Sequence, residues 1–113
     1  MRESLNIKGT LLYGVEFEGT LHKDFEVRPL LVKDSITAGT ASVGKSSVYH
    51  EACLVACQLV SLGTIPKESI TVDLLLEMLD DDYGEIQNAR IDLQKKIQGP
   101  TADSKNSDSS SSS

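Results

Sequence analysis

Hydrophobic and polar residues alternate through residues 11–18, as they do in a β-strand with one buried face. Three larger apolar side chains fall on one side, and a glycine and two acids on the other: Tyr13, Val15 and Phe17 against Gly14, Glu16 and Glu18. Residues 19–24 are predicted to reverse the chain, and residues 25–28 to return as a second strand that ends before Pro29. Because a hairpin with one apolar face is unstable alone in water, we expect it to lie on helices.

After residue 34 the apolar residues take helical spacing. Asp34 is predicted to cap a weak helix over residues 35–42, in which Gly39 and two threonines lower the helix propensity. A stronger helix is predicted to begin after Ser46 or Ser47 and to run to Leu62, with Gly63 as its C′ residue.

Two further helices are predicted from their caps. After a connector over residues 64–68, Thr71 is placed to cap a short helix through Leu79. Asp80, Asp81 and Asp82 begin the last helix, where Asp82 and Glu85 have the spacing of a capping box. Lys95 and Lys96 favour the helix dipole in its last turn, and Gly99-Pro100 end it. An apolar stripe repeats every three or four residues along it: Tyr83, Ile86, Ala89, Leu93 and Ile97.

These elements predict an α+β fold: one domain over residues 1–99, with an N-terminal β-hairpin packed on three to four α-helices. A disordered Ser-rich C-terminal tail is predicted over residues 100–113, because Ser, Asp, Asn and Lys cannot build a core. The predicted core consists of Phe17, Phe25, Val27, Leu54, Leu59, Leu75, Leu79, Ile86 and Leu93. The pattern leaves open whether the hairpin packs within one monomer or is exchanged between subunits.

Charge is concentrated in one segment of this 113-residue chain. The net charge is −6, and residues 73–85 alone contain six acids and no base. A basic stripe for nucleic acid and a polybasic membrane-binding segment are therefore not expected. The most apolar window, residues 52–62, is far shorter than the roughly 20 residues that span a bilayer. Residues 1–6 also lack the apolar run of a signal peptide, so we expect a cytoplasmic protein.

Residues 39–46 match the phosphate-binding string G-x-x-x-x-G-K-[ST], ending in Lys45 and Ser46. A helix is predicted after it, but the residues before Gly39 do not form an apolar strand. A flexible connector is therefore the favoured interpretation, and a nucleotide-binding protein the weaker one.

Two other clusters contain residue types that bind metals. His50, Cys53 and Cys57 share one helical face, but a fourth ligand is not evident, and packing of buried thiols is the simpler interpretation. In residues 80–85 the glycine is one place too early for an EF-hand loop, and helix capping explains the acids. We therefore expect neither a catalytic site nor a cofactor.

Three segments resemble one protein family: Val27-Arg28-Pro29 at the end of the hairpin, residues 62–71, and Leu74-Leu75 followed by residues 79–83. In their order and acidity they are similar to the tail assembly chaperones of long-tailed bacteriophages, in particular the Mu-like group. The likeness covers roughly residues 11–98, and it rests on diffuse patterns without a catalytic signature.

The resemblance implies a non-enzymatic protein that binds the long, helical tape measure protein and keeps it soluble in the host cytoplasm during tail assembly. It further implies absence from the mature virion, and possible contact with the tail tube protein or with a second copy of the chain. A small acidic adaptor domain remains an alternative. The predicted partner-binding residues are Leu74, Leu75, Met78, Tyr83, Ile86 and Ile97, which exceed what one side of a small core requires. Placement of all six in the core is the competing interpretation.

Overall fold

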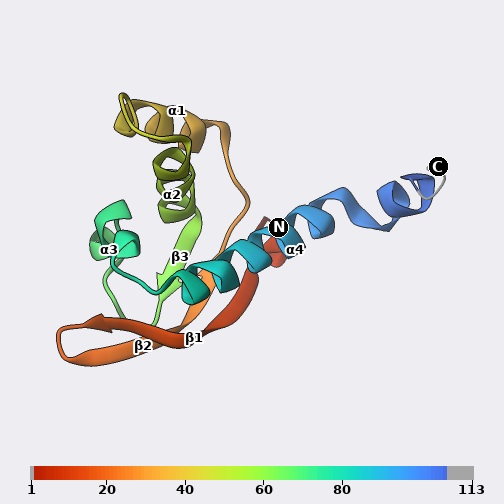
Figure 1. Ribbon diagram of the computed structural model, residues 1–113. Coiled ribbons are helices and arrows are strands. Elements are labelled where there is room, and N and C mark those ends of the chain that lie inside the picture. Colours follow the sequence, from red (N-terminus) through yellow and green to blue (C-terminus); the bar gives the residue numbers. More distant parts are fainter. Residues whose placement is uncertain (1, 107–113) are drawn as a thin grey trace.

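A computed structural model describes residues 2–106, and of residues 2, 3 and 100–106 it describes the backbone alone. The elements, in chain order, are η1 (Arg2–Leu5), β1 (Ile7–Phe17), β2 (Thr20–Val27), α1 (Val32–Ala41), α2 (Ser47–Gln58), β3 (Leu59–Leu62), η2 (Lys67–Ser69), α3 (Val72–Leu76) and α4 (Asp80–Asn106). The strands form one antiparallel sheet in the order β1-β2-β3. The α-helices lie on one side of the β1-β2 hairpin, and α4 crosses over it (Figure 1). The predicted α+β class is confirmed.

The hairpin turn is tighter than predicted. Phe17 pairs with Thr20, so only Glu18 and Gly19 connect the strands, and both have a positive φ, of 51° and 80°. Two consecutive positive φ values are typical of the two-residue turns that match the twist of a hairpin. The predicted reversal over residues 19–24 is therefore wrong from residue 20 onward, where β2 has already begun.

A wide bulge interrupts β1 in its middle. The register passes from Thr10 opposite Asp24 to Val15 opposite His22, so that residues 11–14 face Lys23 alone. At its end Gly14 has a φ of 112°, and a Cβ there would lie 3.0 Å from the carbonyl oxygen of His22. The bulge breaks the alternation of side chains. Tyr13 consequently points to solvent while Val15 is buried, and the prediction that they share a face is wrong.

Residues 59–62 form the third strand, where the sequence predicts the end of a helix. As predicted, α2 has Ser46 as its N-cap, whose hydroxyl accepts the N–H of Tyr49, but the helix ends at Gln58. Leu59 and Leu62 are buried and pair with Val27 and Phe25 of β2. Periodicity does not separate a four-residue apolar strand from a buried helical turn, which accounts for the error.

The other helices differ from prediction mainly at their ends. Asp34 is the third residue of α1 and not its N-cap; its carboxylate accepts the N–H of the N-cap residue Leu31 at 2.7 Å. Thr71 caps α3 as predicted, but α3 stops at Leu76. Leu79 thus lies in the link between α3 and α4.

Helix α4 begins at Asp80 as predicted and is interrupted at Gly99, whose φ of 76° and ψ of 170° are not helical. Helical backbone resumes after this break through residue 106. The remainder of the predicted tail, residues 107–113, lies outside the described residues.

The core lies between the sheet and the helices. Six of the nine predicted core residues are buried there: Phe25, Val27, Leu59, Leu75, Ile86 and Leu93. Phe17 and Leu54 are only partly buried, and Leu79, at 52% exposure, is not a core residue. Leu79 is exposed because it lies in the link between α3 and α4, outside the apolar face of either helix.

Candidate functional site

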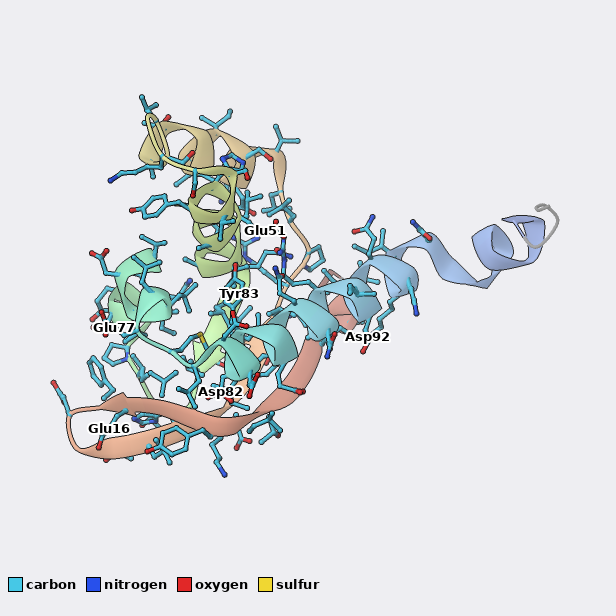
Figure 2. All side chains as sticks on the ribbon, in the orientation of Figure 1. Glu16, Glu51, Glu77, Asp82, Tyr83 and Asp92 are labelled. Atoms are coloured by element: carbon cyan, nitrogen blue, oxygen red, sulfur yellow. The ribbon has the colours of Figure 1, made fainter. Side chains whose placement is uncertain are left out.

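A buried carboxylate fixes the start of α4 on the bulge of β1. Asp82 is fully buried, and its two oxygens accept the backbone N–H groups of Leu12, Tyr13 and Gly14 at 2.8, 2.9 and 2.9 Å. Burial by itself raises the pKa of Asp82, but the three donors outweigh it and hold the pKa below its usual value. Figure 2 shows Asp82 where α4 passes over the hairpin. The predicted capping-box role of Asp82 is wrong, because the helix has already begun at Asp80.

A second polar network joins Arg28, the residue after β2, to α1, α2 and α4. Arg28 forms a two-pronged ion pair with Asp34, at 2.8 and 3.0 Å. The side chain of Gln58 donates to the carbonyl of Arg28 at 2.9 Å and accepts from Arg90 at 2.7 Å, and Arg90 also pairs with Glu51 at 2.7 Å. Hydrogen bonds to these arginines lower the pKa values of Asp34 and Glu51. The two networks hold the helices in fixed positions on the sheet.

Between these networks the link from α3 to α4 forms a ridge with a cleft on each side. The α2 cleft, of about 310 Å³, is lined by Ser46, Val48, Tyr49, Ala52, Leu75, Leu76, Met78, Asp80 and Tyr83. The β1 cleft, of about 290 Å³, is lined by Tyr13, Gly14, Val15, Glu16, Leu74, Glu77, Met78 and Leu79. Met78 lines both clefts, so we call the two together the Met78 surface.

The Met78 surface exposes large apolar side chains from four different elements. Relative exposure is 58% for Tyr13, 72% for Val48, 54% for Leu76 and 52% for Leu79. A single exposed apolar residue is ordinary on a protein surface, whereas several that gather at neighbouring clefts mark a surface for a protein partner. The Met78 surface is therefore the candidate binding site.

One polar atom at the floor of the α2 cleft has no partner in the described part of the chain. The hydroxyl of Tyr83 is buried and makes no hydrogen bond there. Burial, and then the charge of Glu51, raise the pKa of Tyr83. The phenol thus remains neutral and adds no charge to the cleft.

The structure divides the six predicted partner-binding residues. Leu74, Met78 and Tyr83 are half-buried and line the clefts, and Leu75 contributes a buried wall to the α2 cleft. Ile86 has 0% exposure, so its assignment to a binding surface is wrong: it faces the sheet. Ile97 is exposed but lies more than three turns further along α4, outside both clefts.

Sequence reasoning missed the contributions of Tyr13, Val48, Tyr49, Leu76 and Leu79 to this surface. The run Leu74-Leu75-Leu76 does indicate an exposed apolar residue, because a helix that buries one side cannot bury three consecutive leucines. The Tyr13 side chain points to solvent because of the bulge, which the residues around Tyr13 do not predict.

The phosphate-loop string does not form a phosphate loop. Gly39 lies inside α1, Ser46 is occupied as the N-cap of α2, and the ammonium of Lys45 lies 5.2 Å from the centre of the Tyr49 ring. A phosphate loop instead joins the end of a strand to a helix. The interpretation of this string as a phosphate loop is therefore wrong.

The residues with metal-binding chemistry are placed in separate environments. His50 Nδ1 lies 3.0 Å from the hydroxyl of Ser42, whereas Cys53 is buried and burial raises the pKa values of both thiols. Within residues 2–106 no group of three or more His, Cys, Asp or Glu side chains is arranged to hold a metal ion. Cys53 therefore packs in the interior, whereas Cys57 is only partly buried.

No family model matches the chain, and no curated protein or solved structure matches it. Among the described helices, none is both long and apolar enough to cross a membrane.

Proposed function

We propose that this chain is a phage tail assembly chaperone that binds a helical segment of the tape measure protein through the Met78 surface. The observation that carries the proposal is the exposure of Tyr13, Val48, Leu76 and Leu79 around two adjoining clefts. The role is non-enzymatic: the chain covers apolar stripes of its partner in the host cytoplasm and is absent from the mature virion. The resemblance in residues 11–98 supports this function over other helix-binding roles.

Apolar contact supplies the main binding energy in this proposal. Burial of apolar surface contributes about 25 cal/mol per Å², whereas an exposed ion pair contributes at most about 1 kcal/mol. An amphipathic helix that binds in a groove by its apolar stripe gains this energy from buried apolar surface. The net charge of −6 then keeps the complex soluble by repulsion between complexes.

The two polar networks give the clefts fixed walls. Asp82 ties α4 to β1, and Arg90 ties α4 to α2, so the elements on either side of Met78 cannot shift freely. A binding surface that is already ordered loses less conformational entropy when the partner docks. This supports recognition of a preformed helix.

Co-expression with the tape measure protein tests the proposal. The natural candidate is a very long helical protein encoded downstream in the same genome, and the measurement is its soluble fraction with and without this chain. We expect the wild-type chain and Ile91→Asp, an exposed position outside both clefts, to raise that fraction. The double variant Leu76→Asp/Leu79→Asp should not raise it. A tape measure protein as insoluble with the wild-type chain as without it would refute the function.

A small acidic adaptor domain is the alternative that the same surface supports. Affinity capture from infected cells separates the two by the partner that is retained: the tape measure protein, with or without the tail tube protein, or a protein unrelated to tails. Sedimentation of the purified chain tests the further possibility of a homo-oligomer.

A further inference from the structure

The charged side chains that line the Met78 surface all have one sign. They are Asp80 in the α2 cleft and Glu16 and Glu77 in the β1 cleft. Figure 2 shows Glu16 and Glu77 at the same end of the molecule, one on the hairpin and the other beside α3. None of the three has a described salt bridge. Their charges are therefore available to a partner.

Basic residues lie near the Met78 surface but do not line it, among the residues that the structure describes. Lys45 lies over the ring of Tyr49, which lines the α2 cleft, and the stem of Lys23 adjoins Gly14, which lines the β1 cleft. The potential within the clefts is therefore set by carboxylates, two of which, Glu77 and Asp80, belong to the acidic segment of residues 73–85.

The exposed apolar side chains of the surface favour a partner with an apolar stripe. Because Met78 lines both clefts, they adjoin one another, and one helix with apolar side chains along a single stripe can contact both. Such a helix meets Glu16 and Glu77 at the β1 cleft and Asp80 at the α2 cleft. Lysine or arginine on the flanks of this helix gains charge attraction, and glutamate is repelled.

We propose that the Met78 surface recognises a cationic amphipathic helix, with one apolar stripe flanked by lysine or arginine. This inference rests on the proposed function only in assigning the helix to the tape measure protein. The exposed apolar side chains of the clefts select the stripe, and the carboxylates of the clefts select the charge on its flanks.

Two synthetic helical peptides of about 18 residues, five turns, test the charge preference. Both carry the same stripe of leucine and alanine; one has lysine on its flanks and the other glutamate. Fluorescence anisotropy with the full 113-residue chain should show binding of the lysine peptide at least about tenfold tighter, with the ratio falling as salt rises. Equal affinity of the two peptides would overturn the proposal.

The double variant Leu76→Asp/Leu79→Asp separates docking in the clefts from general attraction to an acidic protein. It adds two negative charges while removing apolar contacts, so general attraction predicts tighter binding of the lysine peptide and docking predicts weaker binding. We expect a loss of about tenfold or more, with Ile91→Asp close to wild type and circular dichroism unchanged in both. The proposal fails if the double variant binds as tightly as Ile91→Asp.

A matched pair of charge variants tests the carboxylates themselves. Glu77→Gln/Asp80→Asn should weaken the lysine peptide by roughly two- to fivefold per residue. Glu68→Gln/Asp92→Asn, which removes the same charge at exposed positions outside the clefts, should have a smaller effect. Equal losses would contradict the inference. If the peptide results hold and the tape measure protein still remains insoluble, the proposed function alone fails.

Discussion

Two buried aspartates in this molecule occupy the first turn of a helix, yet different groups compensate their charges. Asp34 in α1 faces the guanidinium of Arg28 and one backbone N–H, that of Leu31. Asp82 in α4 has three backbone N–H donors from the bulge of β1 and no described salt bridge.

The difference separates an adaptable contact from a fixed one. Arg28 has a long side chain, about a quarter exposed, which can follow small movements of α1. The donors to Asp82 belong to the strand itself and cannot move without distorting the sheet. We therefore expect the Asp82 contact to determine whether the domain folds, and the Asp34 contact to determine how firmly α1 is attached.

Replacement of Asp82 is expected to have the largest effect. Asp82→Ala leaves three inward N–H groups without an acceptor, at a cost of about 3–5 kcal/mol in the free energy of unfolding. Urea denaturation should show a much lower midpoint, or no folded state. The neighbouring exposed Asp81→Ala should cost less than about 1 kcal/mol. Similar losses for the two variants would remove the distinction between the fixed and the adaptable contact.

Loss of the ion pair between Arg28 and Asp34 should have an intermediate effect on the free energy of unfolding. Arg28→Met leaves the carboxylate of Asp34 buried without its cation, and because Arg28 is partly exposed we expect a loss of about 2 kcal/mol. Adding Asp34→Asn to this variant should cost little more, since the buried charge is then gone and the amide oxygen can still accept from Leu31. If urea denaturation instead gives additive losses, the two side chains do not act as a pair.

Substitution of the glycine in the bulge of β1 should reduce the free energy of unfolding somewhat less. Gly14→Ala forces a side chain into a positive-φ conformation against the carbonyl of His22, at a cost of about 1–2 kcal/mol. Gly84→Ala, in α4 with open space around it, should instead stabilise by about 0.5–1 kcal/mol. Opposite shifts of the melting temperature would verify both. A neutral Gly14→Ala would mean that the bulge does not need this conformation.

Mild acid should produce the smallest effect. The pKa values of Asp34 and Asp82 are lowered by folding, so their stabilisation is fully present above the ordinary value of 3.8 and is lost as pH falls toward the folded values. Urea midpoints should therefore begin to fall near pH 4 in the wild type, and fall less steeply in Asp34→Asn. Stability that rises on acidification would show that these carboxylates do not act in this way.

Local signals account for the parts of the fold that the sequence predicts. The caps at Ser46 and Thr71, the start of α4 at Asp80 and its interruption at Gly99 each depend on a few neighbouring residues. The alternation in residues 11–18 likewise predicts a strand, although the bulge moves Tyr13 to the other side.

The missed features depend on residues far apart in the chain. Leu59–Leu62 forms a strand because it pairs with the edge of β2. The four residues themselves do not predict this pairing. The candidate site shows the same limit: Leu74, Met78 and Tyr83 were predicted, but Tyr13 and Val48 join them only through the packing of β1 and α2 around the ridge.

The contact between Asp82 and Gly14 spans 68 positions of the chain, which has a consequence during synthesis. At about 5–20 residues per second, the ribosome completes the hairpin at Val27 roughly 3–11 s before it adds Asp82. During that interval the bulge N–H groups lack their carboxylate acceptor, and β1 lacks α4, the helix that packs on it. The newly made hairpin therefore depends on α4 to complete the domain, and a chain that terminates before residue 82 should not reach the native state.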